Sequence, residues 1–582
     1  MTQPKPPARL VQDAILKLAV LEMPSRQNVQ NVMRQTCSGT DFRFPNSQEL
    51  WLAYRALLTK KKVKKNEALE RVLRVKDVRT DSGVAPITVL TKPWACPGKC
   101  VYCPTEARMP KSYISSEPAA ARALSLDFDP YDQVTQRVGA LERNGHEAKK
   151  IELIIKGGTW SNYPWNYRKW FIKRCFDAAN HLGSRTAYNV QRTGSEARGT
   201  RYEVRKRYPT LVASLKANET AGYRIIGLTI ETRPDWVNAE EIKRLREIGC
   251  TRVELGVQTL TDKILEITKR GHKVEDVIRA TALLKTAGFK VDYHILPGQP
   301  GSTPKRDLGD FRRVFADPDF RPDMVKLYPC VVMKGSELYK WNERGDFKPL
   351  EGKKLRELLI DMKTLVPRYC RISRMIRDFP AKDITSGTKI TNLRDEIARD
   401  MEKRGLACVC LRCREVGHVA SLKGSGYDLK TRLFEEWYDN AGGREVFLSI
   451  EDKERKAVFA FLRLRLPLIR RPERSEAKLK DLYKDPSTAL GTTQIYEDFP
   501  VLRDSAIVRE LHTYGTALNL KQTRSDAAQH KGYGKMLMLE AEMIAKREGY
   551  VKVAVISGIG VREYYKMLGY RLKDTYMVKK IT

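Results

Sequence analysis

The chain has 582 residues, and at roughly 100–200 residues per domain this length predicts about three to five domains. Hydrophobic residues make up 42%, which excludes global disorder, and 107 lysines and arginines against 71 aspartates and glutamates give a net charge of +36. Such an excess favours a polyanionic partner, nucleic acid first and a membrane surface second, over a merely solubilising surplus. Because no stretch reaches the ~18 uninterrupted apolar residues of a membrane span and no apolar signal core follows Met1, we expect a cytoplasmic protein.

The first 80 residues are expected to form a basic helical region. Apolar residues recur at spacings of three and four in residues 11–21 and 50–58, which predicts helices there. A lysine run is usually a solvated face, but in so basic a chain we favour contact with nucleic-acid phosphates. The densest run contains Lys60, Lys61, Lys62, Lys64 and Lys65. The next candidate for such contact is the run formed by Arg201, Arg205, Lys206 and Arg207.

Residues 81–375 alternate between short β-rich segments and helical ones, such as 239–248 and 274–287. The expected strands cover residues 87–90, 151–155, 225–230, 252–257, 291–296 and 324–328. This alternation predicts an α/β domain with a parallel sheet and crossover helices. Barrel folds place their chemistry at strand ends, and polar residues stand there in this chain: Lys156, Glu231, Gln258 and His294. The alternative is that these side chains are solvent-facing strand termini.

Three cysteines follow the first expected strand. Cys96, Cys100 and Cys103 have C-x3-C-x2-C spacing, whereas eleven cysteines in the whole chain are too few for a disulfide scaffold. Thiolates are the ligands of iron–sulfur clusters, and a cubane normally takes four of them. Three closely spaced cysteines with an aromatic residue before the last resemble the radical S-adenosylmethionine (SAM) enzymes. A structural zinc site with a distant fourth ligand is the alternative.

This resemblance implies a partial (β/α) TIM-like barrel that carries a [4Fe-4S] cluster on the three cysteines. The fourth iron is left for SAM, and reductive cleavage of SAM yields a 5′-deoxyadenosyl radical. Gly157 and Gly158 match the place where the family's backbone meets the SAM amino group, although Thr159 stands where a glutamate is usual. The resemblance also assigns contacts with the SAM ribose and carboxylate to Glu231, Arg233 and Gln258.

A second cysteine group lies in an irregular, charged stretch that we interpret as a linker over residues 376–440. Cys408, Cys410 and Cys413 place three thiolates within six residues. A closed tetrahedral zinc site needs a fourth ligand, for which Cys330 is the first choice and His418 the second. The alternative is that these cysteines are separate buried thiols.

The last part of the chain, residues 441–582, is expected to form a second α/β domain. It contains expected strands near 506–511, 551–557 and 570–578, helices at 534–547 and 561–568, and a proline- and charge-rich insertion at 470–500. Glycines at positions 532 and 534 open the first of these helices, and a glycine-rich helix start suits a pyrophosphate. In this context the pattern resembles the GNAT acetyltransferases, whose fold binds acetyl-CoA.

That resemblance implies which residues contact acetyl-CoA. In the family, one strand splays from its neighbour and pairs with the pantetheine through its backbone; here that stretch is Glu510, Leu511, His512 and Thr513. The helix start contributes Tyr533, Gly534 and Lys535. A tyrosine of the following helix reaches the thioester sulfur, and Tyr565 or Tyr564 takes that role. Packing onto the sheet is the alternative for either tyrosine.

A radical SAM core followed by a GNAT-like domain resembles the catalytic subunit of Elongator and its stand-alone bacterial and archaeal relatives. The match runs from about residue 79 to the end of the chain and includes the segments 227–235, 254–258, 414–417, 509–512 and 557–562. It implies that a carboxymethyl group derived from acetyl-CoA is placed on C5 of the wobble uridine of tRNA. The basic N-terminal region would bind the tRNA.

The implied chemistry gives both domains a purpose. Uracil C5 is not nucleophilic enough to attack an unactivated acetyl methyl group. A deoxyadenosyl radical would take hydrogen from that methyl, the carbon radical would add to C5, the adduct would lose an electron, and thioester hydrolysis would release CoA. A base in the anticodon loop is accessible because it is single-stranded. The resemblance places Lys156 at the acetyl-CoA and makes the catalytic set Cys96, Cys100, Cys103, Lys156 and Tyr565.

Three other functions remain as alternatives. A protein lysine acetyltransferase would use the C-terminal domain alone and leave the three-cysteine motif without a purpose. A non-catalytic RNA-binding scaffold would have degenerate cofactor sites, and the intact Cys96, Cys100 and Cys103 argue against it. A different radical tRNA modification, such as methylthiolation, would leave the GNAT-like domain without a function. The sequence does not identify the tRNAs modified or the electron donor, nor whether the protein works as a dimer or with Elongator-type partner subunits.

Overall fold

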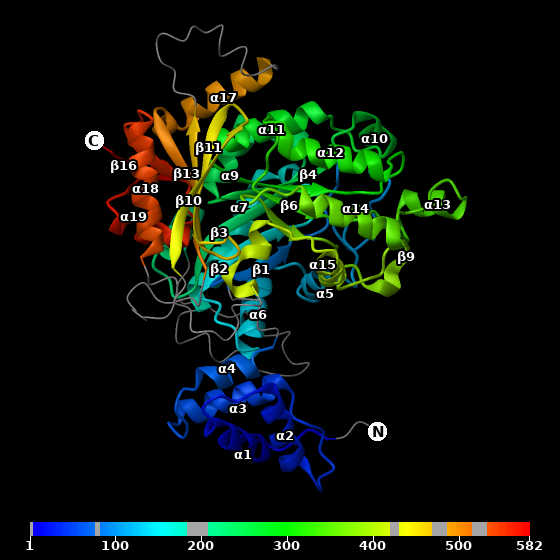
Figure 1. Cartoon of the computed structure of the whole chain (residues 1–582), viewed down its shortest axis with the longest axis vertical. Coiled ribbons are helices and arrows are strands. Elements are labelled where there is room, and N and C mark those ends of the chain that lie inside the picture. Colours follow the sequence, from blue (N-terminus) through cyan, green and yellow to red (C-terminus); the bar gives the residue numbers. More distant parts are fainter. Residues whose placement is uncertain are drawn as a thin grey trace.

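The computed structural model describes residues 4–75, 82–182, 208–419, 430–467, 486–514 and 532–581. Figure 1 shows a small helical body at the N-terminal end, a sheet surrounded by helices, and a second sheet packed beside the first. Among the described residues, none of the helices is both long enough and apolar enough to cross a membrane.

The N-terminal body consists of α1 (Ala8–Ala19), α2 (Arg26–Cys37), α3 (Ser47–Thr59) and α4 (Glu67–Leu73). These helices bury an apolar cluster of their own, and capping boxes begin α2 and α3. The body joins the rest of the molecule through Arg74 Nε, 3.1 Å from the Gly145 oxygen, and His146 Nε2, 2.7 Å from the Val75 oxygen. The predicted helical region is confirmed, and the five lysines of the basic run lie between α3 and α4, at the surface of this body.

The second part is a parallel sheet whose strands follow one another in chain order. It contains β1 (Ala85–Leu90), β2 (Lys150–Lys156), β3 (Arg224–Thr232), β4 (Arg252–Gln258), β5 (Lys290–Ile295), β6 (Met324–Leu327) and β8 (Arg371–Arg374). Helices such as α6 (Pro130–Arg143), α7 (Trp165–Leu182), α9 (Ala239–Glu247) and α11 (Val274–Thr286) lie along its outside (Figure 1). In the described residues β1 and β8 stand at opposite ends of the strand order. The sheet is therefore an open, partial barrel, as predicted.

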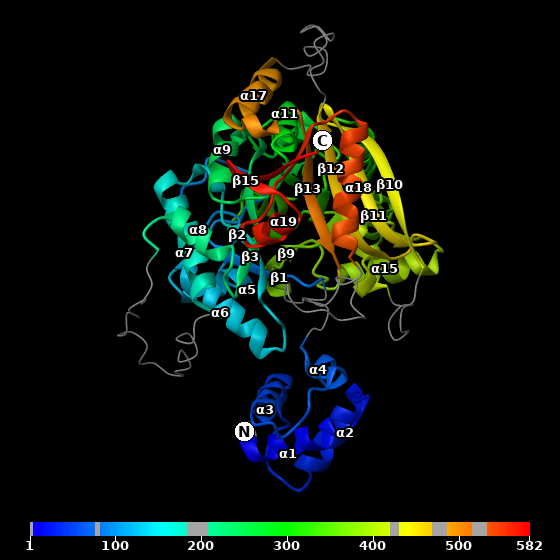
Figure 2. The same cartoon turned by 90° about the vertical axis from the view of Figure 1, so that its left-hand side faces the viewer.

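The third part is a mostly antiparallel sheet. Its order is β10 (Thr431–Asn440), β11 (Gly443–Asp452), β12 (Val458–Pro467), β13 (Ser505–Thr513), β14 (Lys552–Val555), β16 (Tyr576–Lys580) and β15 (Arg571–Lys573). The helix α18 (Tyr533–Arg547) covers the face turned away from the barrel (Figure 2). The ladder between β13 and β14 ends at Val508, whereas β13 continues beside β12 to Thr513. Two neighbouring strands therefore diverge, as the resemblance to the GNAT fold predicts.

The stretch expected to be a linker, residues 376–440, contains regular structure. It holds β9 (Ile384–Ser386) and α15 (Leu393–Lys403), and its last ten residues are β10, which pairs with β11 along its whole length. The second sheet therefore begins at Thr431 and not near residue 441. Most of β10 is exposed or half-buried because it is an edge strand, so its composition gave no clear strand pattern. The helix α17 (Pro486–Asp498) lies in the predicted insertion.

Two glycines allow the second sheet to approach the barrel closely. A Cβ at Gly558 would lie 1.9 Å from the backbone oxygen of Ile226 in β3, and one at Gly560 would lie 2.6 Å from Cβ of Arg224. Real Cβ atoms do not come so near, so any other residue would force the two sheets apart. The second sheet thus packs against the first residues of β3, at the N-terminal end of the barrel strands.

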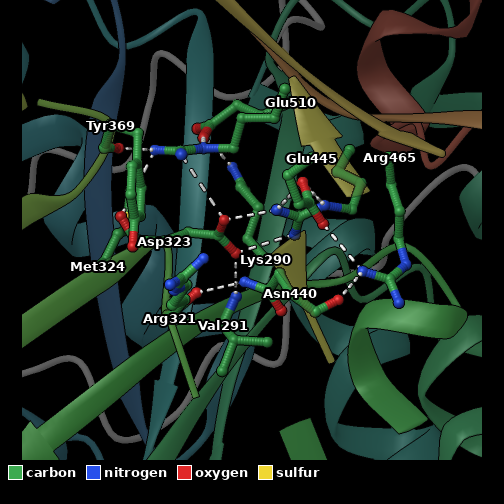
Figure 3. Close-up of polar contacts among 12 residues, drawn as sticks. Lys290, Val291, Arg321, Asp323, Met324, Tyr369, Asn440, Glu445, Arg465 and Glu510 are labelled. Atoms are coloured by element: carbon green, nitrogen blue, oxygen red, sulfur yellow. Dashed lines mark hydrogen bonds and ion pairs between the residues drawn. The ribbon is translucent and has the colours of Figure 1, made fainter. Parts of the chain in front are cut away.

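A buried network of charges also joins the two sheets (Figure 3). Asp323 precedes β6 and accepts hydrogen bonds from Arg509 of β13, at 2.9 Å, and from Lys285 of α11, at 3.0 Å. Arg509 also contacts Glu445 of β11, 2.8 Å away. All four side chains are fully buried. Buried charges are tolerated when they are paired, so each sheet supplies the partners that the other needs.

Candidate active site

One cavity connects the barrel to the second sheet. Its volume is 1010 Å³, and its walls come from the cysteine loop, the interior of the barrel, the end of β13 and the start of α18. The cysteine loop follows the C-terminal end of β1, whereas the second sheet covers the N-terminal end of the barrel strands. The cavity therefore joins the two predicted cofactor sites inside one molecule.

The cysteine loop fits a cluster better than a single ion. Cys100 is buried and Cys96 and Cys103 are half-buried, and their three sulfurs do not all come within 4.8 Å of one another. A hydrogen bond with Cys103, together with the positive charge of Arg270, holds the pKa of the Cys100 thiol well below its usual value. A spread set of three thiols beside a buried cation suits an iron–sulfur cluster.

The turn after β2 exposes its backbone to the cavity. Gly157 has a φ of +131°, and a Cβ there would lie 1.9 Å from Oγ1 of Thr91. Gly158 lines the cavity with nothing within 4 Å of its missing Cβ, so its peptide is open to a ligand. Gln258 also lines the cavity and has a φ of +71°, which is uncommon for a residue with a side chain and frequent at functional sites. These positions are compatible with SAM.

A group of buried charges occupies the interior of the barrel. Nζ of Lys156 lies 2.8 Å from Glu231 and also contacts Glu254, and Nε2 of His294 lies 3.1 Å from Glu254. Burial opposes the charge on Lys156, but Glu231 and Glu254 outweigh it and raise the pKa of the ammonium group. Burial and the adjacent Lys326 lower the pKa of His294, which is therefore neutral at pH 7. Neither Glu254 nor Lys326 was predicted from the sequence as a site residue.

A β-bulge turns two successive residues of β13 toward the barrel. The register with β12 shifts between Arg463 and Leu464, and both Arg509 and Glu510 then point to barrel partners. Glu510 lies 3.1 Å from Lys290 at the start of β5 and 2.9 Å from Arg463. Burial opposes its charge, but Lys290 and Arg463 lower the pKa of Glu510 to about 2. Bulges commonly redirect side chains next to active sites.

The predicted acetyl-CoA residues are largely brought together at this end of the cavity. The lining includes Glu510, Leu511, His512, Thr513, Gly534, Lys535, Tyr564 and Tyr565. Tyr533 differs, because it packs in the apolar core under α18, and its hydroxyl lies 3.1 Å from Oγ1 of Thr431. A Cβ at Gly534 would lie 2.7 Å from the hydroxyl of Tyr564. The absence of a side chain at Gly534 therefore leaves room for the hydroxyl of Tyr564.

The second cysteine group converges, but its predicted fourth member does not join it. The sulfurs of Cys408, Cys410 and Cys413 lie within 4.8 Å of one another, as a tetrahedral ion requires. Cys330 is instead buried in an apolar cluster with Val101 and Leu296. His418 pairs with Glu415, at 3.1 Å.

Two further predictions concern charged residues. Arg233 lines the cavity beside the cysteine loop, where its guanidinium contacts Asp235 at 2.8 Å and where a Cβ at Gly98 would lie 2.8 Å from its Nη1. The basic run Arg201, Arg205, Lys206 and Arg207 lies outside the described residues.

An open parallel barrel with a three-cysteine loop defines a radical SAM protein, and the family models agree. The Radical SAM superfamily model matches residues 95–311, and the Radical_SAM C-terminal domain model matches residues 322–403. The chain is 44% identical to the tRNA uridine(34) acetyltransferase of Methanocaldococcus infernus, over 88% of each chain. It is 42% identical to that of Dehalococcoides mccartyi, over 86% of this chain and 99% of the relative.

Eukaryotic and structural relatives point to the same family. Human Elongator complex protein 3 is 35% identical over 88% of this chain and 86% of its own. The solved structure of the archaeal Methanocaldococcus infernus Elp3 with an N-terminal deletion of residues 1–46 superposes with a TM-score of 0.67 at 40% identity, covering 86% of this chain and 99% of that one. The chain belongs to the family of the tRNA uridine(34) acetyltransferases and Elongator complex protein 3.

Proposed function

We propose that this protein modifies uridine 34 of tRNA by adding a carboxymethyl group, derived from acetyl-CoA, to C5 of the base. The observation that carries the proposal is the single cavity of 1010 Å³ that reaches from the cysteine loop to β13 and Tyr565. Its two ends match the two cofactors that such a reaction needs. The names of the relatives support the substrate, since they specify tRNA and uridine 34.

The barrel end would hold a [4Fe-4S] cluster and SAM. Cys96, Cys100 and Cys103 supply three thiolates, and the open peptide of Gly158 and the side chain of Gln258 border the space for SAM. When bound, these groups supply a carbon radical strong enough to take hydrogen from an acetyl methyl group. We assign the remaining SAM contacts to Gly157, Glu231 and Arg233.

The second sheet would hold acetyl-CoA. Beyond Val508, β13 diverges from β14, so the backbone from Glu510 to Thr513 would run beside the pantetheine. Lys535, at the start of α18, borders the same part of the cavity and would face the phosphates. Burial raises the pKa of the Tyr565 hydroxyl, which keeps it a hydrogen-bond donor for the thioester sulfur.

The charges inside the barrel would position the acetyl group and the base. Glu231 and Glu254 keep Lys156 protonated, so its ammonium group can donate a hydrogen bond to a carbonyl oxygen in the cavity. His294 is neutral beside them and can accept or donate a proton. Burial of Glu254 and His294 lowers the local dielectric constant and strengthens these interactions.

Two accessory sites complete the proposal. The lysines 60, 61, 62, 64 and 65 at the surface of the helical body would contact tRNA phosphates, with Arg201, Arg205, Lys206 and Arg207 as a second basic segment. Cys408, Cys410 and Cys413 would bind zinc. The segment that holds these cysteines already contacts the barrel, since Leu411 N donates to the oxygen of Cys370, at 2.9 Å. The zinc would stabilise that segment in this position.

The direct test is mass spectrometry of nucleosides from tRNA incubated with the reduced, iron-loaded protein, SAM and acetyl-CoA deuterated at the acetyl methyl. We expect carboxymethyluridine, with deuterium also found in 5′-deoxyadenosine. Cys100→Ser should abolish both products while binding of acetyl-CoA persists. Carboxymethyluridine without deuterium in 5′-deoxyadenosine would refute the radical step. Acetylation of protein lysines by both the wild type and Cys100→Ser, without any modified uridine, would favour the lysine acetyltransferase alternative.

A further inference from the structure

Arg270 is a buried cation beside the cysteine loop. It lies between α10 (Asp262–Ile267) and α11, and only 8% of its surface is exposed. Nη2 donates to the backbone oxygen of Gly256 at 2.7 Å, and Nη1 donates to Sγ of Cys100 at 3.5 Å. Within the described part of the chain, no carboxylate forms an ion pair with Arg270. The side chain that its guanidinium contacts is therefore that of Cys100, one of the three proposed cluster ligands.

The strand β4 is shaped to admit this guanidinium. A Cβ at Gly256 would lie 2.3 Å from Nη2 of Arg270, so only glycine leaves the space that the arginine occupies. Glycine inside a strand weakens it and often marks the close approach of another group. The second arginine at the loop, Arg233, differs because Asp235 offsets its charge at 2.8 Å. Arg270 is thus the cation whose charge the cysteine loop itself must balance.

We propose that Arg270 is the fixed counter-charge of the metal cluster on the cysteine loop and that it sets the reduction potential of that cluster. A desolvated cation is costly unless an anion faces it. One-electron reduction adds negative charge to a cluster, and a cation in a low-dielectric site stabilises the reduced form more than the oxidised form. Removing the cation must therefore make the potential more negative. The inference rests on the cluster ligation proposed above and not on the RNA substrate.

The test compares variants reconstituted with iron and sulfide under anaerobic conditions, by redox titration followed with EPR in the absence of SAM. Arg270→Gln should bind the same amount of iron and sulfide as the wild type but reduce at a more negative potential. Gly256→Ala should shift the potential in the same direction, because the added methyl displaces the guanidinium. The matched control is Lys269→Gln. Lys269 is half-exposed and pairs with Glu337 at the surface, where solvent screens its charge, so the potential of this variant should stay unchanged.

An unchanged potential in a fully loaded Arg270→Gln protein would overturn the inference. If Arg270→Gln binds no iron, Arg270→Lys decides the matter. A loaded Arg270→Lys protein at the wild-type potential supports the role of the charge, and Gly256→Ala then supplies the comparison. An Arg270→Lys protein that is also empty overturns the inference, because the side chain would then shape the loop. Wild-type protein that takes up no iron and sulfide would instead refute the cluster ligation itself.

Discussion

Lys290, the first residue of β5, and Glu510, on the bulge of β13, form an ion pair of 3.1 Å across the junction between the two sheets. Both side chains line the cavity, and both are mostly buried. The strand proposed to hold acetyl-CoA is thereby fixed to the floor of the barrel. Because Glu510 is also held by Arg463 of β12, its position depends on both sheets at once.

Replacing Lys290 should therefore weaken acetyl-CoA binding without unfolding the protein. In Lys290→Ala, Glu510 keeps Arg463 but loses its barrel partner, and we expect a loss of about 1–2 kcal/mol in binding, roughly a factor of 5 to 30. Isothermal titration with acetyl-CoA measures the effect. The control is Lys263→Ala, since Lys263 pairs with Glu266 on the exposed surface of α10. Equal affinities in the two variants would contradict the positioning role.

Glu510 should also contribute to the stability of the protein in acid. Its pKa in the folded protein is about 2, below the value of about 4.3 expected when unfolded, so the unfolded state binds the proton more readily. The stabilisation is then complete above pH ~4.3 and is lost as the pH falls toward ~2, with an upper value of about 3 kcal/mol. Chemical denaturation between about pH 5 and pH 2.5 should show a smaller decline in Glu510→Gln than in the wild type. An equal decline of the free energy of unfolding with pH in the wild type and in Glu510→Gln would contradict this contribution.

Gly558 should not tolerate a side chain. A Cβ there would lie 1.9 Å from the backbone oxygen of Ile226, and both partners are backbone, so the sheets must separate. We expect Gly558→Ala to lower the free energy of unfolding by more than about 3 kcal/mol. Gly309→Ala is the control, because nothing lies within 4 Å of its missing Cβ and α12 (Pro304–Ala316) gains from alanine by up to about 1 kcal/mol. Similar free energies of unfolding for the two variants, measured by chemical denaturation, would mean that the junction between the sheets accommodates the added methyl group.

Replacing Lys60, Lys61, Lys62, Lys64 and Lys65 together by alanine should weaken the binding of all tRNAs to a similar degree. These side chains lie at the surface of the helical body and are proposed to touch phosphates, which carry no sequence information. The slope of log K against log salt should fall by roughly 0.7–0.9 for each phosphate that is no longer neutralised. Fluorescence titrations at several salt concentrations measure it. The double variant Lys353→Ala, Lys354→Ala, on the exposed start of α14 (Gly352–Thr364), should bind like the wild type.

Zinc should depend on Cys410 and not on Cys330. Cys410 belongs to the converging group, whereas Cys330 is buried among apolar side chains elsewhere. Elemental analysis should find about one zinc per chain in the wild type and in Cys330→Ser, and none in Cys410→Ser. Zinc retained by Cys410→Ser would mean that other residues bind the ion. Loss of zinc in Cys330→Ser would instead support Cys330 as the fourth ligand, as expected from the sequence.

Local patterns predicted much of the fold. Apolar segments and periodicity mark the first six barrel strands and the helices α9, α11 and α18, and the spacing of the three cysteines marks the loop. The strand β8 escaped notice because its four residues, Arg371–Arg374, include two arginines and a serine, and only its neighbour β6 makes it a strand. Likewise β10 is an edge strand with mostly exposed or half-buried side chains, so its sequence lacks the apolar run of a buried strand.

The site depended more on contacts between residues that are distant in sequence. Glu254 of β4 contacts His294 of β5 and also Lys156 of β2, 98 residues away, so its role emerges only when the three strands lie together. Gly256 reads as a weak point in a strand until Arg270 is seen beside it. Cys330 was assigned to zinc because cysteine spacing does not reveal which way a strand end faces.

The salt bridges between Asp323 and Arg509 have a consequence for how the chain is made. Arg509 follows Asp323 by 186 positions, so at about 5–20 residues per second the ribosome needs roughly 10–40 s to add this second cationic partner to the one that Lys285 already provides. During that interval the second sheet is incomplete and does not yet cover the N-terminal end of the barrel strands. The nascent barrel therefore passes through a stage in which its uncovered surface is accessible to chaperones.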